Sequence, residues 1–191
     1  MTSVVVYANA TLDLPSAAIE GQTIASLFQG SKLFEGKEAS KANFLSHGAT
    51  KDILHLATHG QLDMSDALKS HLDLAEGQQI SQQEIFEMDL ERTTLVTLSA
   101  CNTALSERHD VDFVTSLAEA FWIAGSRSVV ATLWSVDDDS TGLLMGEFYK
   151  GIKSGKTKSQ ALRDAQLAVK NDSRFEHPYY WGGIVLFGDW R

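Results

Sequence analysis

Short apolar runs alternate along this chain with segments whose apolar residues recur at helical spacing. Each run is bounded by polar or turn residues, which is typical of buried strands. The runs that predict strands cover residues 3–7, 32–34, 52–58, 94–100, 128–134 and 183–187. The segments that predict helices cover residues 16–28, 40–45, 81–88, 114–123, a stretch after 137–139, and 157–169.

Several of these helices carry recognisable start or stop signals. Pro15 with Ser16 as cap predicts one start, and Ser81 with Glu84 three residues later forms a capping box. Gly125 predicts a helix end. Strands that alternate with helices favour a mainly parallel sheet covered on both faces. The sequence therefore predicts a three-layer α/β/α sandwich, with residues 1–191 as one domain.

Two reactive side chains stand at the ends of strong apolar runs. His59 ends the run that starts at Ile53, and Cys101, the only cysteine, ends the run that starts at Leu95. A lone cysteine is more often a buried core residue. Here Asn102 follows it directly, which favours the rim of the sheet, where ligands of parallel sheets bind.

A thiol and an imidazole at one sheet edge have the chemistry of a nucleophile and its general base. His59 would take the thiol proton, the thiolate would attack a carbonyl, and water would later hydrolyse the thioester. Backbone N–H groups at Gly60 and Cys101 would hold the oxyanion, at about 3 to 4 kcal/mol per donor. Asp63 or a backbone carbonyl is the candidate to orient His59.

This chemistry needs neither a metal nor another cofactor. His55 and His59 are four residues apart, but in a strand that spacing separates them by about 13 Å, too far to share a metal ion. His55 is instead expected to be a core histidine bonded to a neighbour.

The composition indicates where the protein is located and which classes of partner it binds. The net charge of −9 disfavours nucleic acid and anionic lipid, and no apolar stretch approaches the ~18 residues of a membrane span. One cysteine allows no internal disulfide, and the start of the chain has no export signal, so we expect a cytoplasmic protein. Protein or peptide partners are favoured.

Four ordered motifs together resemble the CHAT domain, a caspase-like peptidase module related to separase, over about residues 4–190. They are His59-Gly60, Leu98-Ser99-Ala100-Cys101-Asn102-Thr103, Leu133-Trp134-Ser135-Val136-Asp137-Asp138 and His177-Pro178-Tyr179-Tyr180-Trp181. The resemblance implies a caspase-haemoglobinase fold and a cysteine endopeptidase with a His59–Cys101 dyad. It also implies that the module can belong to a longer protein whose tetratricopeptide repeats switch the peptidase on.

The separase likeness further implies a pocket for a basic side chain before the cleaved bond. Asp112, Asp137 and Asp138 are the matching positions, although helix capping and solvation explain these carboxylates equally well. Three places depart from the family pattern. Val111 and Phe113 flank Asp112 where relatives have a Gly-Glu-Gly-like stretch, Asn102 stands where an acid is frequent, and Gly182-Gly183 stands in the last strand where larger residues are common.

Two other functions fit the same residues. A catalytically silent caspase-like interaction module would keep the fold without activity. A thiol acyltransferase would use the same dyad but resolve the acyl-enzyme with an amine instead of water.

Overall fold

A six-stranded sheet forms the centre of the molecule. The computed structural model describes residues 2–61, 63, 66–99 and 110–191, without the side chains of 110–116. Neighbouring strands follow the order β2-β1-β3-β7-β8-β9, and the first five run parallel while β9 is antiparallel to β8. Their bounds are β1 Val4–Ala8, β2 Lys32–Glu35, β3 Ile53–Ala57, β7 Leu95–Leu98, β8 Ser128–Thr132 and β9 Ile184–Gly188.

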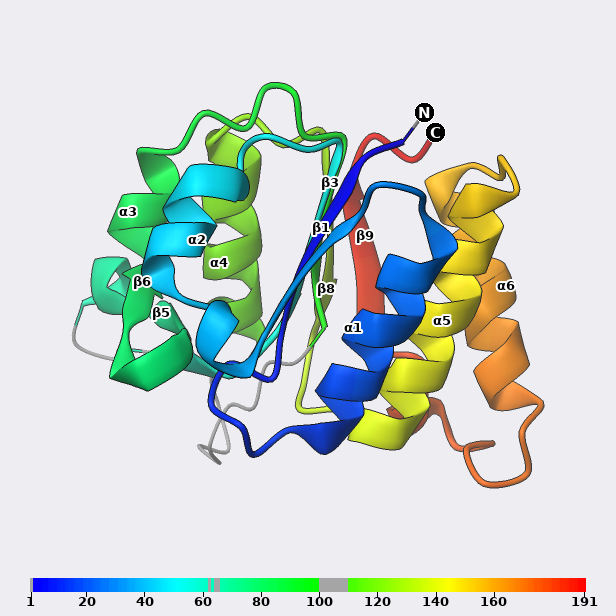
Figure 1. The fold of residues 1–191 in the computed structure, drawn as a ribbon. Helices are drawn as coiled ribbons and strands as arrows, with labels where there is room; N and C mark the ends of the chain where they lie inside the picture. The colour runs from blue at the N-terminus through cyan, green and yellow to red at the C-terminus, as the bar shows by residue number, and fades with distance from the viewer. Residues whose placement is uncertain (1, 62, 64–65, 100–109) are drawn as a thin grey trace.

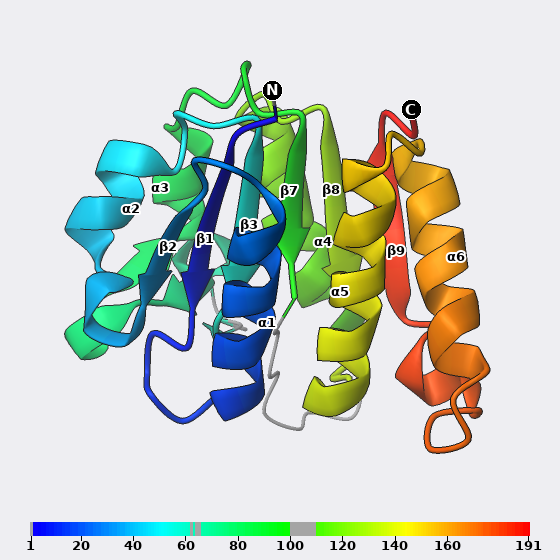
Figure 2. The same ribbon diagram turned by 45° about the vertical axis from the view of Figure 1, so that its right-hand side comes forward.

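Helices cover both faces of this sheet (Figures 1 and 2). One layer consists of α1 Pro15–Leu27, α5 Asp138–Lys153 and α6 Lys158–Lys170, and the other of α2 Lys41–His47, α3 Gln82–Phe86 and α4 Asp110–Ile123. One buried apolar cluster lies between the sheet and each of the two helical layers. Because both faces are covered, the central strands are buried and mostly apolar, with His55 of β3 and Thr97 of β7 as buried polar exceptions. The predicted three-layer sandwich with a mainly parallel sheet is confirmed.

Helix starts agree with the sequence at α3 and differ at α1. At α3, Ser81 and Glu84 form the predicted capping box. The prediction that Ser16 caps α1 is wrong, because the helix already begins at Pro15, which has no N–H to cap. Asn9 Oδ1 accepts the Leu14 N–H at 2.8 Å instead, and the Ser16 hydroxyl donates to Asp139 Oδ1 at 3.1 Å.

A second, small antiparallel sheet follows β3 and was not predicted. Its strands are β4 Gly60–Gln61, β5 His71–Asp73 and β6 Gln79–Ser81, too short for any periodic pattern to show. The Asp73 N–H donates to the His59 carbonyl at 2.8 Å. This hairpin fixes the chain directly beyond β3, where His59 lies.

No helix in the described part of the chain has the length and apolar content to cross a bilayer.

Candidate active site

The strands that carry His59 and Cys101 are direct neighbours in the sheet. β3 and β7 pair in parallel with Leu56 opposite Leu98, and the Ser99 N–H extends this pairing to the Leu56 carbonyl at 2.9 Å. His59 is three residues beyond Leu56, and Cys101 is three residues beyond Leu98. Cys101 itself lies outside the described residues, so its distance from His59 remains a prediction.

His59 is held at this edge by an acid that the sequence did not indicate. Both carboxylate oxygens of Asp13 lie 3.0 Å from His59 Nε2. Asp13 follows β1, and β1 pairs with β3, so the loops after the two strands meet at one edge. Asp63, the expected orienting residue, accepts the Asp66 N–H at 3.1 Å. Only the strand order could have identified Asp13, which is 46 residues from His59.

The surroundings of Asp13 favour its ionised form. The Thr11 hydroxyl, with a smaller contribution from the His59 imidazole, holds the pKa of the Asp13 carboxyl below its ordinary value. A charged carboxylate at Nε2 favours the imidazole tautomer with the proton on that nitrogen. Nδ1 of His59 is then left with the lone pair that a general base needs.

The backbone of Gly60 points away from the small sheet. Gly60 stands opposite Leu72, and the neighbouring pair, His59 and Asp73, shares the hydrogen bond between β4 and β5. Alternate residues of an antiparallel pair turn their N–H groups to opposite sides. The Gly60 N–H is therefore directed away from β5, which an oxyanion donor requires.

The predicted acidic positions have different surroundings. Asp137 caps α5, with its Oδ1 accepting the Ser140 N–H at 2.9 Å. Asp138 is exposed at the first turn, yet burial around its carboxyl, followed by the charge of Asp137, raises its pKa. Asp112 lies in α4, and its side chain is outside the description.

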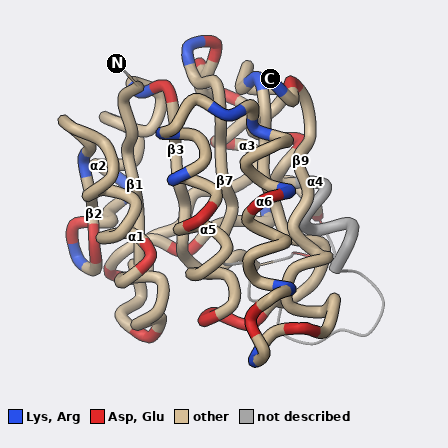
Figure 3. Tube along the Cα trace, turned by 90° about the vertical axis from the view of Figure 1, so that its right-hand side faces the viewer, with Lys and Arg blue, Asp and Glu red and all other residues tan. Residues whose placement is uncertain are grey.

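A hollow of about 250 Å³ opens between α1 and α5 beside Asp138. Asp138 and Asp139 are the exposed acidic residues of its wall, which is completed by Ser16, Ile19, the mostly buried Glu20, Thr23, Gly142 and Leu143. Figure 3 marks the acidic positions along α1 and α5 in red. This part of the edge has the charge that a cationic side chain prefers.

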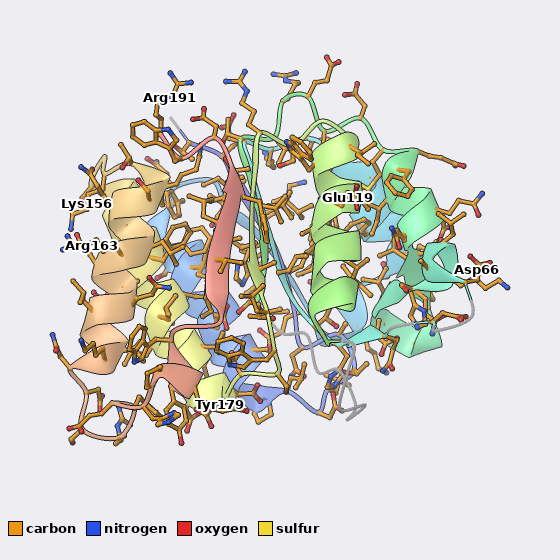
Figure 4. The ribbon with its side chains drawn as sticks, turned by 180° about the vertical axis from the view of Figure 1, so that it is seen from behind. Asp66, Glu119, Lys156, Arg163, Tyr179 and Arg191 are labelled. Atoms are coloured by element: carbon orange, nitrogen blue, oxygen red, sulfur yellow. The ribbon has the colours of Figure 1, made fainter. Side chains whose placement is uncertain are left out.

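Two of the sequence motifs meet to hold the loop before α5. Trp134 Nε1 donates to the Tyr179 carbonyl at 3.0 Å, and the Tyr179 hydroxyl donates to the Ser135 carbonyl at 2.7 Å. Figure 4 labels Tyr179 at this end of the molecule. A Cβ on Gly183 would lie 2.5 Å from the Trp134 ring. Position 183, directly before β9, therefore has no room for a side chain.

Solved structures with a similar fold include separase and the cysteine proteinase gingipain R. Separase of Saccharomyces cerevisiae, in complex with securin, gives a TM-score of 0.61 at 14% identity, covering 98% of this chain and 12% of separase. The Arg-specific cysteine proteinase gingipain R gives 0.66 at 11%, covering 98% and 46%. The complex of Porphyromonas gingivalis RgpB pro- and mature domains gives 0.65 at 11%, covering 99% and 47%.

This chain thus spans a small part of separase and less than half of gingipain R. At these identities the likeness shows the fold, which is of the caspase-haemoglobinase type. No curated protein sequence gives a significant match. The sequence profile described as the CHAT domain matches residues 4–189. With a match over nearly its whole length, the chain belongs to the CHAT domain family.

Proposed function

We propose that this chain is a cysteine endopeptidase that hydrolyses peptide bonds in a protein substrate, with Cys101 as nucleophile and His59 as general base. The observation that carries the proposal is the pairing of His59 with Asp13 at the end of β3, beside the end of β7. A core histidine has no need of a solvated carboxylate partner at a sheet edge. A general base gains a fixed ring orientation from it.

In the proposed reaction, His59 Nδ1 removes the proton from the Cys101 thiol, and the thiolate sulfur bonds to the substrate carbonyl carbon. The backbone N–H groups of Gly60 and Cys101 hold the resulting oxyanion. The C–N bond then breaks as the protonated His59 gives its proton to the leaving amine. Water, deprotonated by His59, next attacks the thioester, and the released sulfur is ready for another cycle.

We further propose that the residue before the cleaved bond is basic, with arginine and lysine as the candidates. Asp138 beside the acidic hollow supports this substrate class, and gingipain R is described as Arg-specific. Asp112 would complete the pocket from α4. Asp137 would act indirectly, because its carboxylate already caps α5.

A regulatory protein, attached or separate, is proposed to switch the peptidase on. Separase is seen with securin, and the mature RgpB domain with its pro-domain, so both relatives form complexes with a protein partner. A tetratricopeptide-repeat region is the partner that the family resemblance favours. The single cysteine fits a reducing cytoplasmic setting.

The test is labelling of the purified chain with a peptide-based thiol-reactive probe across a range of pH. Wild type, Cys101→Ala and His59→Ala are compared, with the denatured wild-type chain as the free-thiol reference. Fast labelling that needs both residues supports the proposal, and hydrolysis of arginine and lysine peptides then follows.

Labelling no faster than in the denatured chain, also after the regulatory partner is added, would instead favour the silent interaction module. Transfer of the acyl group to an added amine in preference to water would favour the acyltransferase.

A further inference from the structure

A buried polar cluster lies between the sheet and the layer of α1 and α5, apart from the His59 edge. It consists of Glu20, His55, Thr97, Ser99 and Tyr149, and we name it the Glu20 cluster. Each of the five residues is at most 5% exposed. Burying a carboxylate is unfavourable unless polar partners surround it, so the contacts inside the cluster must offset this cost.

Glu20 is the centre of these contacts. Its Oε1 accepts a hydrogen bond from the Ser99 hydroxyl and lies 2.9 Å from His55 Nε2. On the other side of the imidazole, His55 Nδ1 is 2.5 Å from Thr97 Oγ1. One carboxylate oxygen on α1 thereby contacts both β3 and β7.

Tyr149 of α5 contacts the cluster on the side of the His55 ring opposite Glu20. Its hydroxyl shares a hydrogen bond of 2.6 Å with Thr97 Oγ1 and lies 3.2 Å from His55 Nδ1. The two rings meet edge to face, with centroids 5.4 Å apart. Two helices are thus tied to the two strands that end at His59 and Cys101.

Stability alone does not account for this arrangement. Apolar side chains of similar volume often stabilise a core as well as a buried ion pair does, whereas only polar groups fix a direction at each contact. Ser99 is two residues before Cys101 and is the last residue of β7's pairing with β3 that the structure describes. A hydrogen bond at Ser99 therefore acts at the point where the chain leaves toward the nucleophile.

We propose that Glu20 is a positioning residue for the active site. By holding the Ser99 hydroxyl and the His55 imidazole together, it fixes the end of β7 against β3 and so sets the approach of Cys101 to His59. This inference rests on the proposed peptidase function. Glu20 acts through Ser99 and contacts none of the reacting atoms in the proposed mechanism.

The experiment measures the rate of Cys101 alkylation by iodoacetamide against pH in the full chain. Wild type is compared with Glu20→Gln, which keeps an acceptor oxygen and removes the charge, and with Ser99→Ala, which removes the hydroxyl. Ser126→Ala is the matched control, because Ser126 is also buried and donates its hydroxyl to a backbone carbonyl, of Ser128, at 2.9 Å. Ser99→Thr restores a hydroxyl.

In wild type we expect a midpoint below the free-thiol pKa of about 8.5, because His59 stabilises the thiolate. Glu20→Gln and Ser99→Ala should move the midpoint toward the free-thiol value. They should also lower kcat for peptide hydrolysis by about 10²-fold, the cost of a misplaced reacting group. Ser99→Thr should recover part of the loss, and Ser126→Ala should behave as wild type.

Unchanged midpoints in the folded variants would overturn the inference and leave the proposed function intact. An equal shift in Ser126→Ala would also overturn it, because the effect would then be general loosening. If Glu20→Gln does not fold, Ser99→Ala decides the question. A wild-type midpoint at the free-thiol value would overturn the proposed function and this inference together.

Discussion

The middle and the end of β3 each present a histidine to a carboxylate, with very different exposure. In the middle, His55 Nε2 lies 2.9 Å from Glu20, and the two side chains are 0% and 4% exposed. At the end, His59 Nε2 lies 3.0 Å from Asp13, and the side chains are 13% and 62% exposed. Only four residues of the chain separate a buried pair inside β3 from a solvent-exposed pair just beyond its end.

The comparison shows that the neighbouring groups, more than the pair itself, decide what a histidine can do. Both ring nitrogens of His55 face polar partners inside the protein, since Thr97 and Tyr149 occupy the side opposite Glu20. His59 has Asp13 at Nε2 and a position just beyond the end of β3. A general base must exchange protons with substrate and water, so the edge pair is suited to catalysis and the buried pair to holding the strands.

The largest expected effect is the loss of His59, the proposed general base. His59→Gln should lower kcat/KM for peptide hydrolysis by about 10³-fold, because general base catalysis is removed. The melting temperature should change little, since Asp13 is solvated. Peptide cleavage and thermal unfolding measure the two quantities, with His47→Gln on α2 as the control. A variant that keeps its activity would end the assignment of His59 as base.

For the buried pair of His55 and Glu20, we expect the main loss in stability. His55→Leu leaves the Glu20 carboxylate buried without its imidazole partner, and we expect a loss of about 3–5 kcal/mol in the free energy of unfolding. Urea unfolding measures this loss, with His59→Leu at the exposed end of the same strand as the comparison. Equal losses in the two variants would contradict the distinction between a structural and a catalytic histidine.

Asp13 tests whether the edge carboxylate matters for the reaction. Asp13→Asn should lower kcat by about 10-fold, less than for a buried triad acid, because solvent screens this contact. The control is Asp164→Asn, which removes another exposed carboxylate, 2.7 Å from Lys156.

The sign of the pH effect follows from the lowered pKa of Asp13. The stabilising contact of the ionised Asp13 carboxylate with His59 is fully present above the pKa that Asp13 has in the unfolded chain. It is lost as the pH falls through the lower pKa of the folded protein. Activity at neutral pH should therefore retain this contribution fully. A kcat for Asp13→Asn equal to that of wild type would leave His59 without a carboxylate partner in catalysis.

The smallest effect is expected at Asp138. Asp138→Asn should raise KM for arginine peptides by about 5-fold, the upper range for an exposed ion pair. Burial raises the pKa of Asp138, so the carboxyl becomes neutral at a higher pH than an ordinary aspartate. Wild-type KM for these peptides should rise as the pH falls through that value, and this dependence should be weaker in the variant. Peptides with an apolar residue before the cleaved bond serve as the control. Faster cleavage of these peptides than of arginine peptides would exclude a preference for basic residues.

Local sequence patterns determined most of the architecture. The apolar runs indicated the six strands of the central sheet, the Ser81–Glu84 box marked the start of α3, and four motifs identified the family. They also placed His59 at a strand end. Periodicity and capping involve residues within a few positions of one another, so a single sequence carries this information in full.

Tertiary structure alone decided which distant residues meet. Asp13 reaches His59 because β1 lies beside β3, and Glu20 reaches Ser99 because α1 packs against this face of the sheet. Position 183 accepts only glycine, because the Trp134 ring occupies the space that a side chain would need. Such contacts depend on strand order and on packing between elements, and no short-range pattern encodes them. The physical reason is that local preferences fix each element, while its partners are chosen by the burial of all elements together.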